Sequence, residues 1–223
     1  MAAARRSSEG VRSAVVPTAH ESSVIKTLLR LRHAEGACTR CSLYQFATQV
    51  VPGAGSVGAT LMLVGEQPGD HEDRSGTPFV GPAGKMLDRA LHDAHIVRAE
   101  VYVTNAVKHF KYEMRGKRRL HKRPNLHEIE QCRLWLEHEL RVVKPRAVIA
   151  LGATAARSLF GRSVTISGAR GRSHTLADGR TAFVTIHPSF LLRLREDAQR
   201  ERAYLAFVAD LKRAKRFCAK LSV

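Results

Sequence analysis

The chain has 223 residues, of which 44% are hydrophobic and 26% charged, a balance typical of a globular protein with a packed core. This length allows one α/β domain of good size and argues against two independent cores. No stretch approaches the ~20 apolar residues that a membrane-spanning helix needs, and no apolar segment follows the first arginines as it would in a signal peptide. We therefore expect a cytoplasmic protein and exclude membrane, secreted, fibrous and disordered classes.

The net charge of the chain points to its partner. Lysine and arginine number 37 against 20 aspartates and glutamates, which gives a formal net charge of +17. An excess of this size is typical of proteins that bind polyphosphates, so nucleic acid is the leading candidate. Charge alone does not separate DNA from RNA, and it leaves anionic membrane surfaces and acidic proteins open.

The apolar pattern predicts strands that alternate with helices. Residues 1–22 predict a mobile basic leader, and a short helix around Ser23–Ala34 opens the domain, which spans residues 23–223. Four apolar runs of strand length follow, at Thr60–Val64, Val101–Val107, Ala147–Leu151 and Ala182–Ile186. Helical spacing of apolar residues is found at Gly84–His95, Leu126–Val143, Thr154–Leu159 and near Arg195–Phe217. This order predicts a parallel sheet with helices on both faces, a three-layer α/β/α fold.

Polar residues follow the predicted strands, at the edge of the sheet where open α/β folds bind their ligands. These residues are Gly65-Glu66-Gln67-Pro68-Gly69, Asn105, Gly152 and His187-Pro188-Ser189. The first motif predicts a sharp turn that brings Glu66 to the edge, although a solvated glutamate on such a turn is the alternative. His187 can donate a hydrogen bond to developing negative charge, whereas a lone histidine is more often structural. A carboxylate and an imidazole at two strand ends of a basic protein favour a joint site.

The four cysteines indicate a metal site in a reducing compartment, because their uneven spacing does not suit a disulfide scaffold. Cys38 and Cys41 form a CxxC pair, and Cys132 with a nitrogen ligand would complete four-coordination. Sulfur-rich sites of this kind hold zinc or an iron–sulfur cluster, and the spacing favours neither. Cys218 lies in the last predicted helix and is expected to be a thiol that binds no metal.

Taken together, the motifs resemble the uracil-DNA glycosylase superfamily, specifically its family 4 type with an iron–sulfur cluster. The resemblance runs from Ser23 to Phe217 and implies the four-stranded parallel sheet of that superfamily. It rests on Cys38-x-x-Cys41, the GEQPG turn at 65–69, the GTPFVGPAG loop at 76–84, TNAVK at 104–108, Cys132 and His187-Pro188-Ser189.

Two departures from the family 4 pattern are similar to the UdgX subgroup, whose members become covalently attached to DNA through a histidine. His109 stands where family 4 enzymes typically have cysteine, and the basic insertion Lys117-Arg118-Arg119-Leu120-His121 follows it. The resemblance implies a [4Fe-4S] cluster with the ligands Cys38, Cys41, His109 and Cys132. The alternative for His109 is a loop histidine, with water or another residue as the fourth ligand. Because the implied chemistry needs no electron transfer, the cluster is expected to be structural.

The resemblance also implies roles for the residues at the strand ends. Phe79 would stack on the uracil ring, Asn105 would read its amide edge, and the backbone of Gly65 and Gln67 would shape the pocket. His187 would donate a hydrogen bond to uracil O2, which stabilises the departing base. Glu66 would orient a water molecule or stabilise the sugar cation.

His121 is expected to take the place of that water molecule. A histidine within reach of C1′ is a preorganised nucleophile, and Glu66 can accept its proton. The resulting N-alkylimidazole should persist, because imidazolide is a much worse leaving group than the uracil anion, so we expect a single turnover. The alternative is that the KRRLH segment only binds phosphate and that His121 adds polarity.

The remaining expectations concern DNA contacts and the positioning of the basic loop. Lys117, Arg118, Arg119 and Arg193 are expected to neutralise phosphates. Asp70 and Asp73 position His121 or its loop, or are merely solvated. Ser189 contacts the strand beside the flipped nucleotide, or else caps a helix.

The leading hypothesis is therefore a monomeric, covalently trapping uracil-DNA glycosylase that prefers single-stranded DNA and associates with the nucleoid. A multi-turnover family 4 glycosylase and a non-catalytic iron–sulfur nucleic-acid-binding protein are the alternatives.

Overall fold

The computed structural model describes residues 25–220. The predicted leader at residues 1–22 and the start of the first predicted helix therefore lie outside the described residues. The helix α1 spans Leu28–Gly36 rather than beginning at Ser23, because Thr27 has an extended backbone and its hydroxyl accepts the N–H of Arg30 at 3.3 Å, as an N-cap does. No helix in the described range is long and apolar enough to cross a membrane.

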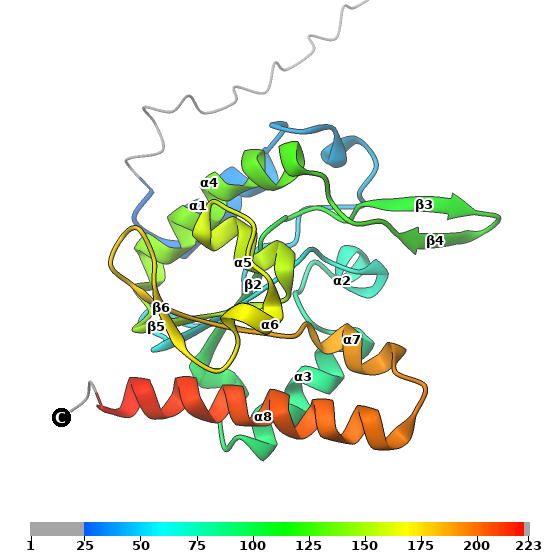
Figure 1. The fold of residues 1–223 in the computed structure, drawn as a ribbon. Coiled ribbons are helices and arrows are strands. Elements are labelled where there is room, and N and C mark those ends of the chain that lie inside the picture. The colour runs from blue at the N-terminus through cyan, green and yellow to red at the C-terminus, as the bar shows by residue number, and fades with distance from the viewer. Residues whose placement is uncertain (1–24, 221–223) are drawn as a thin grey trace, which may run out of the picture.

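The described strands form a five-stranded sheet in the order β2-β1-β5-β7-β6 (Figure 1). Four of them are parallel and match the four predicted runs: β1 (Leu61–Gly65), β2 (Val101–Asn105), β5 (Ala147–Leu151) and β7 (Thr181–Thr185). Every residue of β1, β2 and β5 is buried, as expected for parallel strands covered on both faces. The fifth strand, β6 (Ser173–Thr175), pairs antiparallel with β7 and corrects the four-stranded expectation. Its three residues contain no apolar run, so the sequence pattern carried no signal for it.

Helices cover both faces of the sheet, which confirms the three-layer α/β/α architecture. The long helices are α1, α3 (Pro82–Asp93), α4 (Leu126–Val143), α5 (Ala153–Phe160) and α8 (Asp197–Lys220), and the short ones are α2 (Asp70–Ser75), α6 (Ile166–Ala169) and α7 (Pro188–Arg193). Apolar side chains of α3 and α8 pack on one face of the sheet, and those of α4 and α5 pack on the other. The bounds of α4 agree with the sequence prediction because Asn125 and Glu128 form a capping box at its start.

The basic segment between β2 and α4 forms a hairpin rather than the loop expected from its sequence. β3 (Tyr112–Arg115) and β4 (Arg118–His121) pair antiparallel around a turn at Gly116, where φ is +59°. Figure 1 shows this hairpin projecting from the body of the protein, with its base beside α2. His121 is the last residue of β4, so pairing with Tyr112 fixes its backbone. The expected catalytic histidine thus lies on a strand at the base of the hairpin.

Candidate active site

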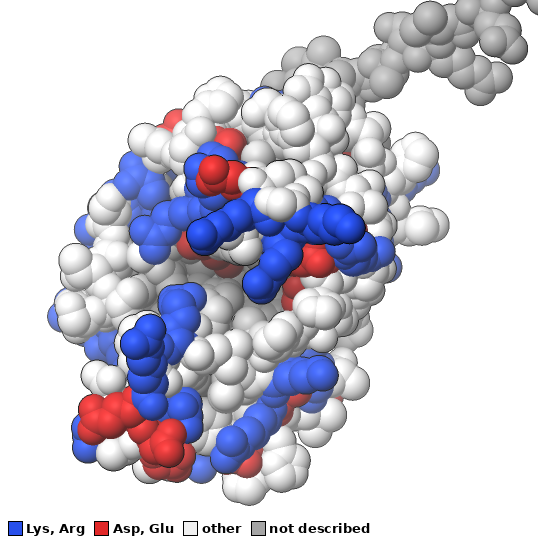
Figure 2. Space-filling model, turned by 90° about the vertical axis from the view of Figure 1, so that its right-hand side faces the viewer, with Lys and Arg blue, Asp and Glu red and all other residues white. Residues whose placement is uncertain are grey.

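A cavity of about 900 Å³ opens at the carboxyl edge of the parallel strands. Its lining includes a residue at the end of each: Glu66 after β1, Asn105 at the end of β2, Gly152 after β5 and His187 after β7. This is the place where α/β sheets bind ligands, and the volume suits a small molecule or a nucleotide. The predicted strand-end residues therefore do meet in one cavity. Figure 2 shows lysine and arginine side chains gathered around a hollow on this face.

The inner wall of the cavity is built around Gly65, Phe79 and Asn105. A Cβ atom at Gly65 would lie 2.3 Å from Asn105 Oδ1 and 2.5 Å from Phe79 Cζ, so both side chains need a glycine there. Asn105 is 2% exposed, and its Oδ1 has no hydrogen-bond partner among the described residues. An unpaired buried amide oxygen is costly, which favours a ligand that donates a hydrogen bond to it.

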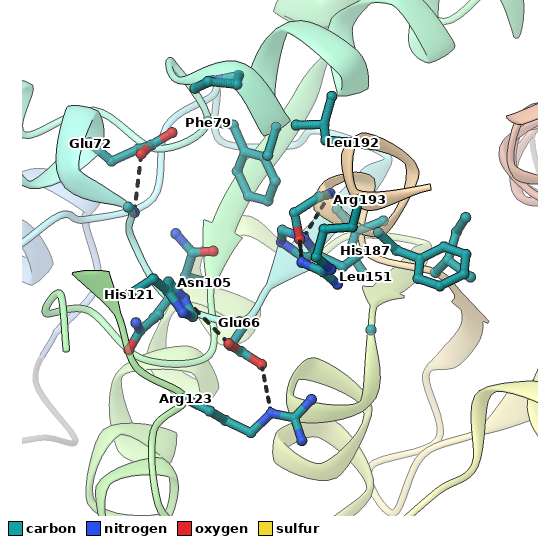
Figure 3. A pocket seen from close by; sticks show the side chains of 18 of the residues that line it. Glu66, Glu72, Phe79, Asn105, His121, Arg123, Leu151, His187, Leu192 and Arg193 are labelled. Atoms are coloured by element: carbon teal, nitrogen blue, oxygen red, sulfur yellow. Dashed lines mark hydrogen bonds and ion pairs between the residues drawn. The ribbon is translucent and has the colours of Figure 1, made fainter. Parts of the chain in front are cut away.

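The loop that carries Phe79 is held by a buried carboxylate, Glu72 (Figure 3). Glu72 Oε1 accepts the backbone N–H groups of Val80 at 3.1 Å and Gly81 at 2.8 Å, and Oε2 accepts that of Gly69 at 3.1 Å. Phe79 itself adopts φ +57°, an unfavourable conformation for an aromatic residue that the surrounding contacts must hold. Sequence reasoning missed Glu72, because nothing in an acidic run distinguishes a buried member from solvated ones.

His187 presents one nitrogen to the protein and leaves the other for a ligand. Its Nδ1 lies 3.2 Å from the backbone nitrogen of Ser189 and 2.8 Å from Ser189 Oγ. A backbone N–H can only donate, so Nδ1 accepts and the ring proton resides on Nε2. Burial lowers the pKa of His187 to about 4, with further lowering from His121 and Arg193. The site thus holds a neutral imidazole that can donate from Nε2.

Ser189 forms hydrogen bonds with His187 and is not the N-cap of α7. The N-cap of α7 is His187, whose side chain accepts the Ser189 N–H. Arg193 donates to Ser189 Oγ at 3.0 Å, and a guanidinium cannot accept, so the serine hydroxyl donates its own hydrogen to His187 Nδ1. The capping alternative for Ser189 is therefore wrong.

His121 faces Glu66 across the mouth of the cavity (Figure 3). The Nε2 atom of His121 lies 3.5 Å from Glu66 Oε1. Burial is the largest influence on His121 and lowers its pKa, although the Glu66 charge acts in the opposite direction. The second carboxylate oxygen of Glu66, Oε2, accepts a hydrogen bond from Thr154 Oγ1 at 2.5 Å and lies 3.7 Å from Arg123 Nε. A neutral imidazole next to a carboxylate has both a free lone pair and an acceptor for its proton.

Arg119 anchors the hairpin to the body of the protein. Its Nε donates to Asp70 Oδ1 at 2.5 Å, its Nη1 donates to Asp73 Oδ2 at 2.6 Å, and its guanidinium lies over the rings of Phe110 and Tyr112. Only 12% of the side chain is exposed. These contacts argue for a positioning role for Arg119 in place of the expected phosphate contact.

Asp73 and Gln67 complete this attachment of the hairpin. Asp73 is fully buried and also accepts the backbone N–H of Thr48, so it is not a solvated carboxylate. The Nε2 atom of Gln67 donates to the carbonyl oxygens of Lys111 at 3.1 Å and Lys122 at 3.0 Å, one on each side of the hairpin base. The residues that follow β1 therefore hold His121 in place.

The other expected phosphate contacts are exposed on the surface. Lys117 and Arg118 lie at the tip of the hairpin, whereas Arg193 lines the cavity. Arg123, which follows the hairpin, is also exposed and lines the cavity. Lys108 differs from these residues, because its side chain is 1% exposed and Nζ lies 2.6 Å from Glu139 Oε2. Its ammonium also donates to the carbonyl oxygen of Asn105 at 3.0 Å and so supports the end of β2.

Three cysteines, Cys38, Cys41 and Cys132, lie together in the packed region between α1 and α4. Cys38 and Cys132 belong to one cluster of buried residues, and Cys41 packs against it. Burial, with smaller contributions from Cys38 and Cys41, raises the pKa of Cys132 to about 12. Trp135 Nε1 donates to Cys38 Sγ at 3.1 Å, and the backbone N–H of Lys108 donates to Cys132 Sγ at 3.2 Å. Sulfur atoms that accept N–H donors are typical of cluster ligands, so this donor set suits an iron–sulfur group.

The fourth expected ligand stands apart from this donor set. His109 is 6% exposed, and burial lowers its pKa, so the imidazole is in the neutral form that binds metals. The charge that acts on it is that of Asp73 rather than of a cysteine. Across residues 25–220, no three His, Cys, Asp or Glu side chains are arranged so that they could hold a metal ion as they stand.

Comparison with known proteins agrees with this architecture. Residues 52–212 match the family model of the uracil DNA glycosylase superfamily. The chain is 36% identical over 185 residues to a type-4 uracil-DNA glycosylase of Thermotoga maritima, and the aligned region covers 82% of this chain and 90% of that protein. It is 35% identical over 179 residues to the type-4 uracil-DNA glycosylase of Pyrobaculum aerophilum, with 74% of this chain and 86% of that protein aligned. It is 31% identical over 194 residues to the type-4 uracil-DNA glycosylase of Archaeoglobus fulgidus, with 82% of this chain and 89% of that protein aligned. On this fold, this cavity and these matches, the chain belongs to the uracil-DNA glycosylase superfamily.

Proposed function

We propose that this protein excises uracil from DNA and is then captured on the abasic sugar through His121. The observation that carries the proposal is the position of His121. The hairpin places its imidazole 3.5 Å from Glu66, in the same cavity as His187 and Asn105. A basic hairpin that only bound phosphate would not need a histidine aimed into the cavity. Relatives named type-4 uracil-DNA glycosylase support the excision of uracil.

Recognition of the base rests on Phe79 and Asn105. An N-glycosidase acting on DNA takes the target base out of the stack or from a single strand, and reads it along its hydrogen-bonding edge. The ring of Phe79 offers a stacking surface, and the unpaired Oδ1 of Asn105 accepts the imide N–H of uracil. Cytosine has no N–H at that ring position, so the same oxygen disfavours it.

Departure of the base depends on His187. When the C1′–N1 bond breaks, its electron pair leaves with uracil and negative charge develops on O2. A neutral His187 with its proton on Nε2 donates a hydrogen bond that strengthens as this charge grows. Ser189 and Arg193 hold the ring in that tautomer through Nδ1.

Capture replaces the bond to uracil by a bond to histidine. An unprotonated ring nitrogen of His121 donates its lone pair to C1′, and the proton on the other nitrogen passes to the Glu66 carboxylate. That proton then neutralises the released uracil anion, so the products are uracil and a neutral N-alkylimidazole joined to the abasic sugar. Imidazolide is a poor leaving group, so one turnover is expected.

We also propose that Cys38, Cys41, Cys132 and His109 hold a [4Fe-4S] cluster. The convergence of the three sulfur atoms and their N–H donors supports the sulfur ligands, whereas His109 as the fourth rests on its burial and neutral state. When bound, the cluster would supply structural cross-linking between the segment after α1 and helix α4. We expect the protein to act as a monomer, to prefer single-stranded DNA and to associate with the nucleoid.

The test is a denaturing gel after wild type or His121→Ala is mixed with a uracil-containing single-stranded oligonucleotide. A heat- and detergent-stable shifted band with wild type alone supports capture by His121. Free uracil and an abasic strand without a shifted band identify a conventional multi-turnover glycosylase, in which Glu66 orients water. If no uracil is released and no shifted band appears, the protein is a non-catalytic nucleic-acid-binding member of the superfamily.

A further inference from the structure

The two oxygens of the Glu66 carboxylate have different surroundings. Oε1 faces His121 Nε2 at 3.5 Å, whereas Oε2 accepts the Thr154 hydroxyl at 2.5 Å and has the exposed Arg123 at 3.7 Å. A carboxylate can rotate about its last torsion angle, and a partial rotation turns the lone pairs of both oxygens away from their partners. The short contact with Thr154 opposes this rotation. Oε1 is therefore the oxygen available to a reacting group.

Thr154 holds this position because of the strand order of the sheet. β5 lies between β1 and β7, so the turn that leaves β5 runs between Glu66 and His187. Thr154 is in the first turn of α5 and is 6% exposed. The same turn contains Gly152, where φ is +91° and a Cβ atom would lie 3.1 Å from His187 Cβ. The segment from Gly152 to Thr154 thus contacts both Glu66 and His187.

The hydrogen bond between Thr154 and Glu66 has a fixed direction, and no other described residue gives Glu66 Oε2 a contact as short. An ionised carboxylate can only accept, so the Thr154 hydroxyl donates. Arg123 lies farther from Oε2 and its side chain is 77% exposed, so its contact is long and solvated. The first turn of α5 also places the positive end of a helix dipole near the carboxylate, although this field does not distinguish its two oxygens.

We infer that Thr154 is a positioning residue that holds the Glu66 carboxylate with Oε1 directed at His121. The inference rests on the proposed function, because it gives Glu66 the task of accepting the His121 proton. It predicts that loss of the Thr154 hydroxyl shifts the outcome from histidine capture toward hydrolysis by water.

The test compares Thr154→Val, which keeps the shape and removes the hydroxyl, with Thr154→Ser, which keeps the hydroxyl. Ser158→Ala is the matched control, because Ser158 is 2% exposed on the same helix and its Oγ has no hydrogen-bond partner among the described residues. Each variant is mixed with the uracil-containing single-stranded oligonucleotide. The gel gives the ratio of cross-linked to abasic strand and the single-turnover rate of uracil release. Binding is measured on an oligonucleotide whose uridine carries a 2′-fluoro group, which resists cleavage.

Thr154→Val is expected to lower the cross-linked to abasic ratio by roughly tenfold, the effect of one hydrogen bond to a charged group. Thr154→Ser and Ser158→Ala are expected to match wild type, and all four proteins should bind the 2′-fluoro probe equally. An unchanged ratio and rate in Thr154→Val would overturn the inference, as would an equal defect in Thr154→Ser. So would a defect that appears only together with weaker probe binding.

A wild type that forms no cross-link would refute capture by His121 and still leave Thr154 testable. In that case Glu66 orients water, and Thr154→Val should release uracil more slowly than Ser158→Ala, with Thr154→Ser restoring the rate. Equal rates in all variants would then refute the positioning role by itself.

Discussion

The backbone N–H of Ser189 donates to His187 Nδ1 over 3.2 Å, and this contact determines which ring nitrogen carries the proton. It leaves Nε2–H as the donor in the cavity. Desolvation of the ring is the main influence that lowers the pKa of His187, to about 4. The consequences can be measured in both stability and activity.

The stability of the fold should depend on pH through His187. Its pKa is about 4 in the folded protein against an ordinary value of 6.5, so the unfolded chain binds the proton more readily. The stability that this neutral histidine contributes is present above pH 6.5 and is lost as the pH falls toward 4. Between pH 6.5 and 5 the wild type should lose about 1.6 kcal/mol more unfolding free energy than His187→Gln. Urea denaturation of both proteins at the two pH values measures this difference, and parallel losses would contradict it.

His187→Ala should slow the chemical step without weakening binding. The hydrogen bond to uracil O2 matters most in the transition state, so single-turnover uracil release should fall by about 10²- to 10³-fold. Binding to the 2′-fluoro oligonucleotide should stay close to that of wild type. A matching loss of affinity and rate would instead indicate that His187 only shapes the cavity.

Arg119→Ala should separate capture from excision. Without the ion pairs to Asp70 and Asp73, the hairpin that carries His121 loses its anchor, so cross-linking should fall at least tenfold while uracil release remains. Limited proteolysis should then cut the hairpin more readily.

The matched control for this variant is Arg118→Ala, which changes the neighbouring exposed residue of the same hairpin. It should retain cross-linking and weaken DNA binding, with a salt slope lower by about 0.7 for a single strand. If the two variants behave alike, Arg119 is one more phosphate contact.

Gly65→Ala should block the cavity. Its Cβ atom would lie 2.3 Å from Asn105 Oδ1 and 2.5 Å from Phe79 Cζ, the two groups proposed to hold uracil. Preference for the 2′-fluoro uridine probe over the same strand with thymidine should disappear. Gly36→Ala is the control, because nothing lies within 4 Å of a Cβ atom there. Preserved preference in Gly65→Ala would place uracil elsewhere.

Cys132→Ser should remove the cluster, and Cys218→Ser should not. Cys132 lies with Cys38 and Cys41 in one buried group, whereas Cys218 is a residue of α8 that packs into a different core cluster. Wild type and Cys218→Ser should be brown, with broad visible absorption and bound iron, and Cys132→Ser should be colourless and less heat-stable. A colourless wild type that contains zinc would refute the cluster and leave the sulfur site intact.

Much of the architecture could be predicted from local sequence pattern. Apolar runs located β1, β2, β5 and β7, and the helical spacing of apolar residues located α4. Because parallel strands end at the same edge of a sheet, the pattern also brought Glu66, Asn105 and His187 into one expected site. These features are periodic or lie within a few residues of each other, so the sequence alone carries them.

The remaining features were decided by the tertiary structure. The partners of Arg119 lie 46 and 49 residues away along the chain, and Thr154 and Glu66 are 88 residues apart. A local sequence pattern therefore predicts neither contact. The strands of the β3–β4 hairpin are rich in arginine and so lack the apolar pattern of a strand, and solvation remained an alternative for Asp73, whose ion pair with Arg119 is buried. The sequence determined which chemical groups reach the edge of the sheet. The order β1-β5-β7 and the anchored hairpin determined which of them face one another, because that depends on contacts between segments far apart in the chain.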